Sequence, residues 1–232
     1  MNFDLNIEYG DLTIYCSKEL ENFSNDFIDY YNKHINIIKT NLGIKKNIKL
    51  IVALTDDVSQ AYFVYGVSDF SGFFNDDGVF AYINLNGKKN KDYMFKGLMH
   101  ELTHHLYKYY VYGKEKERIT WVDEGIAQFI SGQRQELKDI TLYNTFLQQN
   151  LINIEHLNLN ELNHNDKSFR DYNGYNLSYI AIRYLYETKK LEEFINIINN
   201  QETLLKIGES ILHDVCNYYN MNLKNHNKNF FS

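Results

Sequence analysis

Residues 99–105 read MHELTHH, and residues 121–127 read WVDEGIA. Around the first stretch, apolar side chains recur at steps of three and four, which predicts a helix from Tyr93 to about Tyr110 with Asp92 as its N-cap. The apolar stripe of this helix consists of Phe95, Leu98, Leu102 and Leu106. The second stretch opens another predicted helix, from about Val122 to Gln135. These two helices carry the residues with the most specific chemistry. The fold has to bring the two helices together, so the rest of the chain is interpreted around them.

The first helix carries two histidines and a glutamate in the pattern HExxH. Positions four apart on a helix differ by about 40° in azimuth and roughly 6 Å in rise, so His100 and His104 project from one face toward a common point. Imidazole is a common zinc ligand. Glu101 lies one position round the helix, where its carboxylate can reach a water on the ion and act as a general base. His105 points about 100° away from His104 and is excluded as a ligand.

A third ligand has to come from elsewhere in the chain. A catalytic zinc normally keeps three protein ligands and one open position. Glu124 is the candidate, since it stands near the start of the second predicted helix and the intervening segment is long enough for the two helices to pack side by side. Gly125 and Ala127 would let the helices approach closely. The sequence therefore predicts one Zn²⁺ ion bound by His100, His104 and Glu124.

Composition excludes several other classes of protein. The 232 residues carry 24 basic and 30 acidic side chains, a net charge of −6, which argues against a nucleic-acid partner. The first residues show no signal peptide, and the longest apolar run, residues 50–54, is far too short to cross a membrane. We therefore expect a cytoplasmic protein with no membrane partner. With only Cys16 and Cys216, a cysteine-based metal site is excluded by count.

The rest of the chain predicts an α+β protein. We expect a single catalytic unit over residues 1–232, made of an N-terminal α/β lobe, residues 1–112, and a helical lobe, residues 113–232, that carries the third zinc ligand. The expected elements of the first lobe are a hairpin or bent strand at 6–16, a helix from Ser17 to Gly43, strands at 48–54 and 78–85, and loops at 55–77 with one helical turn near 58–65. In the second lobe, a polar loop at 153–173 precedes helices at 174–187 and 191–199.

The two motifs, HELTH and WVDEGIAQF, resemble those of the gluzincin branch of zinc metallopeptidases, which use HExxH and a downstream glutamate. The second motif is especially similar to that of the aminopeptidases of this branch. The resemblance spans roughly residues 78 to 190, and it implies a zincin-like first lobe with a small mixed sheet. Two positions depart from the pattern. The strand at 78–85 lacks the Gly-x-Met-Glu-Asn stretch that captures a substrate amino terminus, and Gln128 stands where some gluzincins place an aspartate. Gln128 could still accept a histidine N–H through its amide oxygen.

The resemblance extends to residues 175–185, whose leading tyrosine in the family stabilises the oxyanion. It implies that role for Tyr175. A phenol donor is needed because attack of water on a carbonyl creates negative charge on its oxygen. Tyr172 and Tyr179 remain competitors for the role.

These observations predict a zinc metallopeptidase that hydrolyses a peptide or protein substrate. One alternative is a non-hydrolytic binding or regulatory protein that retains a zincin-like zinc site, although an intact Glu101 argues against it. Another is a zinc hydrolase of a non-peptide amide, which would use the same metal ligands. The substrate, endopeptidase or exopeptidase mode and oligomeric state are not readable from the sequence.

Overall fold

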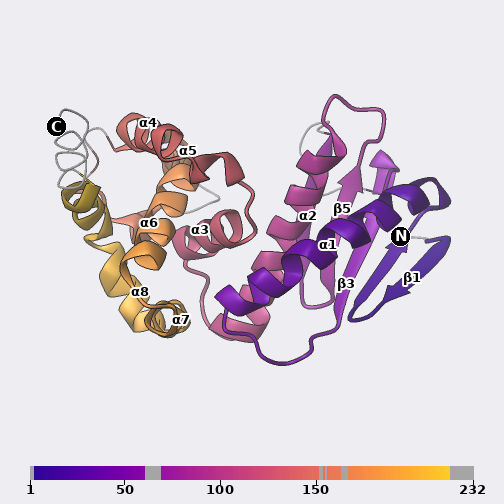
Figure 1. Cartoon of the computed structure of the whole chain (residues 1–232), viewed down its shortest axis with the longest axis horizontal. Coiled ribbons are helices and arrows are strands. Elements are labelled where there is room, and N and C mark those ends of the chain that lie inside the picture. Colours follow the sequence, from indigo (N-terminus) through magenta and orange to yellow (C-terminus); the bar gives the residue numbers. More distant parts are fainter. Residues whose placement is uncertain (1–2, 61–68, 152–153, 155, 163–166, 220–232) are drawn as a thin grey trace, which may run out of the picture. The chain divides into compact units, whose positions relative to one another are not determined.

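The computed structural model describes residues 3–60, 69–151, 154, 156–162 and 167–219. The chain divides into two compact units, each described separately below (Figure 1). Unit 1 contains Met1–Gly113 and Ile130–Gln133, and unit 2 contains Lys114–Phe129 and Arg134–Ser232. A mixed sheet with helices in the first unit and a mostly helical second unit confirm the predicted α+β class.

The sheet of unit 1 has five strands in the order β1-β2-β3-β5-β4. The strands are β1 (Leu5–Tyr9), β2 (Leu12–Cys16), β3 (Leu50–Thr55), β4 (Phe70–Asn75) and β5 (Gly78–Ile83). The two edge pairs, β1 with β2 and β4 with β5, are antiparallel, and the central pairs are parallel. The predicted hairpin forms at Gly10, whose positive φ of 59° suits a glycine. The central strand β3 is almost entirely buried, as a near-continuous apolar run predicts.

Strand β4 was not predicted, because the sequence analysis assigned loops to residues 55–77. Its sequence FSGFFN has no alternation of apolar and polar residues, and all six residues are half-buried at the edge of the sheet. Phe73 stacks on Phe80 of β5, with ring centroids 5.2 Å apart. The Asn75 side chain accepts hydrogen bonds from the backbone N–H groups of Asp77 and Gly78 and thereby closes the turn. The expected helical turn begins as η2 (Val58–Gln60), and its remainder lies outside the described residues.

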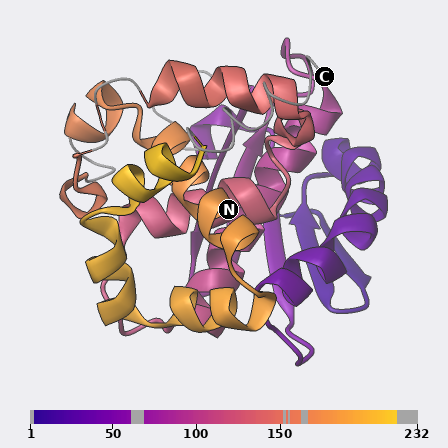
Figure 2. The same ribbon diagram turned by 60° about the vertical axis from the view of Figure 1, so that its left-hand side comes forward.

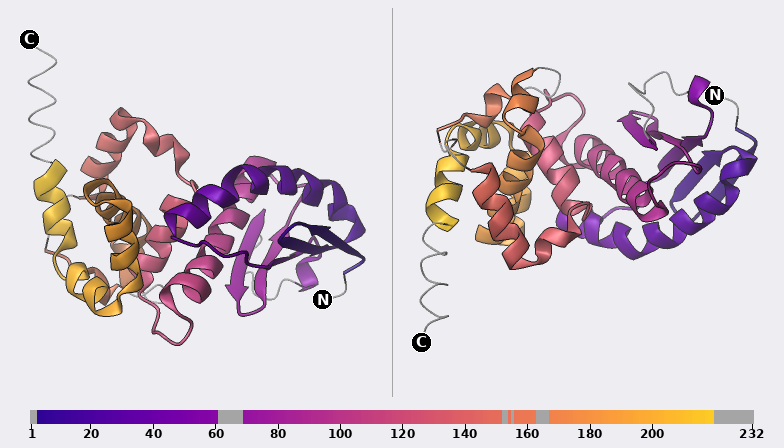
Figure 3. Two further views of the ribbon diagram at one scale, coloured as in Figure 1. Left: turned by 60° about the horizontal axis from the view of Figure 1, so that its bottom comes forward. Right: turned by 90° about the horizontal axis from the view of Figure 1, so that it is seen from above.

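Two helices pack on each other and on the sheet, α1 (Glu21–Asn41) and α2 (Lys91–Leu106) (Figure 3). Their contact includes Phe23 and Phe95, whose ring centroids are 5.0 Å apart. The predicted N-cap Asp92 is wrong. Asn90 is the N-cap, and its side chain accepts from the N–H of Tyr93 at 2.9 Å, while Asp92 pairs with Lys96. A π-helix, η3 (Tyr107–Tyr112), extends α2 as far as Gly113.

Unit 2 is built from helices (Figure 2). Its elements include α3 (Thr120–Ile130), whose last residue belongs to unit 1, η4 (Gln135–Lys138), α4 (Ile140–Asn150), η5 (Leu159–Glu161), α5 (Lys167–Asp171), α6 (Gly174–Thr188), α7 (Leu191–Asn199) and α8 (Gln201–Gly208). Trp121, Tyr143, Phe169 and Phe194 are among its fully buried side chains. The helix α3 ends before the predicted Gln135, and Gly132 follows it with a φ of 73°. Among the described residues, no helix is both long and apolar enough to cross a membrane.

Candidate metal centre

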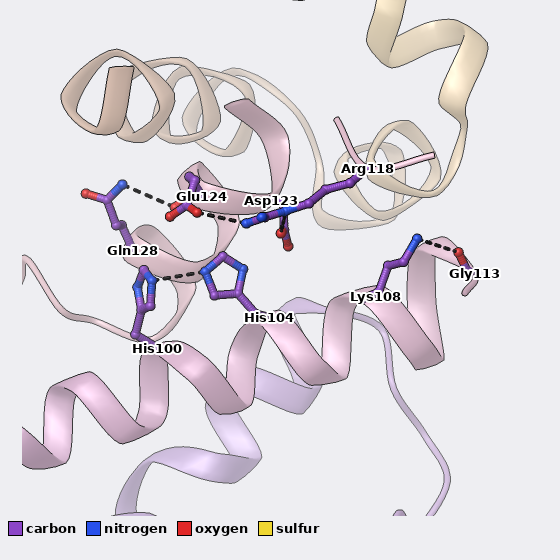
Figure 4. Close-up of polar contacts among 8 residues, drawn as sticks. All are labelled: His100, His104, Lys108, Gly113, Arg118, Asp123, Glu124 and Gln128. Atoms are coloured by element: carbon purple, nitrogen blue, oxygen red, sulfur yellow. Dashed lines mark hydrogen bonds and ion pairs between the residues drawn. The ribbon is translucent and has the colours of Figure 1, made fainter. Parts of the chain in front are cut away.

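The two histidines of the HExxH motif face each other on α2 in unit 1 (Figure 4). Their Nε2 atoms are 3.0 Å apart, and their rings are nearly perpendicular, with centroids 4.6 Å apart. Two imidazole nitrogens on one tetrahedral zinc, each at about 2.0–2.1 Å, lie roughly 3.3 Å from each other. The pair therefore already has nearly the spacing that a single zinc ion requires. Phe74 of β4 stacks on the His104 ring at 5.1 Å and limits its rotation.

Glu101 lies against the edge strand of the sheet. A Cβ atom placed on Gly72 of β4 would come within 2.9 Å of Cγ of Glu101. A Cβ on Gly97 of α2 would come within 2.6 Å of the Phe70 ring. These two glycines let β4 approach α2 closely, and Gly72 leaves the space that the Glu101 side chain occupies. Gly72 was not predicted as part of the site, because the strand in which it lies was not predicted.

His105 is turned away from the histidine pair. It is buried against Tyr109 and Tyr110, and its Nδ1–H donates to the carbonyl of Asn75 at 3.0 Å. Burial lowers the pKa of His105, which keeps its ring neutral at physiological pH. Its contacts are those of a packed side chain, as its direction on the helix predicts.

In unit 2, Glu124 is buried in α3, with 3% of its surface exposed. Its neighbour Gly125 faces α6, where an added Cβ would come within 2.5 Å of Ile182 and would also collide with the backbone carbonyl of Ser178. Gly125 therefore permits α3 to cross α6 closely, which fixes the backbone that carries Glu124. The expected approach of the two motif-bearing helices stays a prediction.

Arg118 binds the two acidic side chains of the second motif (Figure 4). Its Nε donates to Oδ2 of Asp123, and a terminal nitrogen donates to Oε1 of Glu124 at 2.8 Å. Asp123 is as buried as Glu124. Sequence reasoning missed Arg118, because it stands in a charged segment ahead of the helix. An arginine five and six residues before two neighbouring acids is the signal that could have found it.

Gln128 joins α3 to the start of α6. Its amide nitrogen donates to the backbone carbonyls of Glu124 at 3.2 Å and Tyr175 at 3.0 Å. Its amide oxygen accepts from Nε of Arg134 at 2.8 Å. The oxygen that we expected to accept from a histidine is therefore bound by an arginine, and Gln128 holds Tyr175 beside the helix that carries Glu124.

The three candidate tyrosines have different surroundings. Tyr179 is buried among the rings of Phe129, Tyr143 and Phe146, and burial raises its pKa. Tyr175 and Tyr172 are 39% and 50% exposed. The Tyr175 ring packs edge-on against Phe169 with centroids 5.0 Å apart. Tyr179 is thus a core residue, whereas the other two side chains reach solvent.

The donors present fit a zinc ion, because His100, His104 and Glu124 each offer one nitrogen or oxygen ligand atom of a type that zinc prefers. A helix with this histidine pair and an intervening glutamate, packed beside a small mixed sheet, is typical of zinc metallopeptidases. A family model described as collagenase, Peptidase_M9, matches residues 71–225, from β4 through both motifs. The chain belongs to this family of zinc metallopeptidases. A comparison with curated proteins finds no match.

Proposed function

We propose that the protein hydrolyses peptide bonds with one Zn²⁺ ion held by His100, His104 and Glu124, in the manner of a gluzincin. The observation that carries the proposal is the 3.0 Å separation of the two Nε2 atoms on α2, which suits one ion. Bound zinc would supply a Lewis acid that lowers the pKa of water and polarises a carbonyl. Membership of a zinc metallopeptidase family supports the same chemistry.

Glu101 is the general base of the proposed reaction. Its carboxylate accepts a proton from the attacking water and then donates that proton to the leaving amine. Gly72 supports this assignment, because the absence of a side chain there leaves room for Glu101 along β4. A surface glutamate that pointed into solvent would not need a glycine at the neighbouring position of β4.

Tyr175 is the proposed donor to the oxyanion. Its hydroxyl would donate a hydrogen bond to the carbonyl oxygen as negative charge develops there. The hydrogen bond from Gln128 to its backbone carbonyl and the packing of its ring on Phe169 support the choice, because both fix its position. Tyr172 remains the competitor, whereas the burial of Tyr179 disfavours it.

We further propose that residues 1–232 work as a single catalytic unit. In this arrangement residues 1–112 supply the histidines and the base, and residues 113–232 supply Glu124 and Tyr175. A non-hydrolytic binding protein and a hydrolase of a non-peptide amide are the alternatives that an experiment has to separate from this proposal.

The test is cleavage of a mixed peptide library by the zinc-loaded protein, followed by mass spectrometry, with gelatin and native collagen as further substrates. The Glu101→Gln variant is the matched blank, since it keeps the size and hydrogen-bonding capacity of the side chain but removes its basicity. We expect cleavage by the wild type alone, with zinc bound to both proteins. Zinc binding without any peptide cleavage would refute the proposed activity and favour one of the two alternatives.

A further inference from the structure

We propose that Arg118 is a positioning residue that holds one oxygen of Glu124 and directs the other oxygen to the metal ion. Asp123 in turn holds the guanidinium group in place. This inference rests on the proposed function, because it takes Glu124 to be a zinc ligand. It assigns to the segment before α3 a part in metal binding that neither motif reveals.

Arg118 pairs with both acidic residues of the second motif at once. One guanidinium group contacts the carboxylates of two consecutive residues, with Nε on Asp123 and a terminal nitrogen on Glu124 at 2.8 Å. Both acidic side chains are buried, with 4% of the surface of each exposed. The planar guanidinium of arginine can hold two such acceptors in a fixed geometry, which the single ammonium group of lysine cannot do.

The backbone beside Arg118 has little freedom to move relative to Glu124. The carbonyl of the next residue, Ile119, accepts from the N–H groups of Val122 and Asp123, each at 3.1 Å. Ile119 is itself buried. The backbone beside Arg118 is therefore tied to the first turn of α3, so its guanidinium approaches Glu124 from a defined side.

The Glu124 side chain is held at both its backbone and its carboxylate. The backbone of Glu124 is fixed by the hydrogen bond from Gln128 to its carbonyl and by the close contact of Gly125 with α6. With the backbone fixed and Oε1 bound to Arg118, the rotation of the carboxylate is restricted as well. A carboxylate held in this way would offer a bound zinc ion its other oxygen, Oε2, and a single carboxylate oxygen would leave one zinc coordination position for water. Partners of this kind typically change metal affinity by about 10–100-fold when removed.

A cavity beside Arg118 offers a direct way to test its role. The cavity has a volume of about 210 Å³, and its lining includes Arg118, Trp121 and Gln201. The Arg118 side chain is 37% exposed. Truncation of Arg118 to alanine would therefore leave a space that free guanidinium ion can enter from solution.

The experiment measures the zinc dissociation constant by competition with a chelator in Arg118→Met, Arg118→Lys and Asp123→Asn, with thermal unfolding recorded for each. We expect Arg118→Met to weaken zinc binding by about 10–100-fold. Arg118→Lys should recover only part of the loss, because it restores the charge but not the paired geometry. Asp123→Asn should have a smaller effect than Arg118→Met, since the contact between Arg118 and Glu124 remains.

The same Arg118→Met substitution in a Glu124→Ala background separates positioning from a general structural role. If Arg118 acts through Glu124, it should have no further effect on zinc affinity in that background. Equal effects in both backgrounds, or a lowered melting temperature with unchanged zinc affinity in Arg118→Met, would overturn the inference. If Arg118→Met does not fold, the zinc affinity of Arg118→Lys is compared in the wild-type and Glu124→Ala backgrounds instead, and equal effects in the two backgrounds again overturn the inference.

Two further readouts complete the test. Millimolar guanidinium ion should restore zinc affinity to Arg118→Ala and leave the wild type unchanged, and an absence of rescue counts against the inference. The visible spectrum of the Co²⁺-loaded protein should change in Arg118→Met, because the ligand geometry changes. The proposed function fails separately, if the wild type binds no zinc or if Glu124→Ala binds it as tightly as the wild type.

Discussion

Replacing Gly72 with alanine should impair catalysis while leaving zinc binding intact. The added Cβ would lie 2.9 Å from Cγ of Glu101 and 3.2 Å from Cζ of Phe70. An ordinary contact between carbon atoms is about 3.5–4.0 Å, so the Glu101 side chain has to move by roughly 0.6 Å or more. A misplacement of about 1 Å can cost on the order of 100-fold in rate, so we expect a loss of about tenfold, or about 1.4 kcal/mol in the barrier.

The assay compares kcat, KM and zinc affinity in Gly72→Ala with those of Gly97→Ala. The control changes the same contact between β4 and α2, but its Cβ meets Phe70 at 2.6 Å and Glu101 is not among its nearest contacts. We expect the main loss to fall on kcat in Gly72→Ala alone, with zinc affinity unchanged in both variants. A Gly72→Ala protein with the kcat of the wild type would refute the placement of the base beside β4.

Four other predictions follow from the same contacts. Glu124→Ala should weaken zinc binding in a competition with a chelator, and an unchanged affinity would remove Glu124 from the ligand set. Tyr175→Phe should raise the barrier by roughly 2–4 kcal/mol through kcat in steady-state kinetics, and an unaffected kcat would shift the role to Tyr172. Gly125→Ala should lower the free energy of unfolding by about 1–3 kcal/mol in urea titrations, because the contact with Ser178 is backbone; an unchanged midpoint would contradict that close crossing. Lys39→Met should destabilise the protein more at pH 7 than at acid pH, as measured by thermal unfolding. Burial alone would raise the pKa of Asp11, but hydrogen bonds from Lys39 and Tyr31 lower this pKa below 3.8. The stabilisation by this pairing is therefore complete above pH 3.8 and is lost as the pH falls through the lower pKa of Asp11 in the folded state. A difference in melting temperature between wild type and Lys39→Met that is the same at all pH values would contradict the pairing.

Regular periodicity made part of the fold predictable. The apolar stripes of α1 and α2 and the continuous apolar run of β3 appear in the structure where the sequence places them. Strand β4 was missed because an edge strand buries neither face fully, so its sequence carries no alternating pattern. The N-cap of α2 was misplaced by two residues, since Asn90 and Asp92 are equally suited to the position and only the backbone decides between them.

The candidate site, like the fold, was predictable from the sequence only in part. The two histidines and Glu101 were readable because one helix fixes their spacing, and Glu124 was readable from its motif; their roles as ligands and base remain predictions. Arg118 and Gly72 were not readable. Gly72 of β4 contacts Glu101 of α2, and Arg118 contacts Glu124 because the chain bends before α3. Contacts between separate elements leave no periodic pattern in the sequence.

The most direct test of the account is a crystal structure of the zinc-loaded protein with anomalous diffraction at the zinc absorption edge. We predict a single zinc peak, with Nε2 of His100 and of His104 at about 2.0–2.1 Å and one Glu124 oxygen at about 2.0–2.2 Å. The other Glu124 oxygen should stay on Arg118. A zinc peak elsewhere, or one at the histidine pair with Glu124 out of reach, would contradict the central claim.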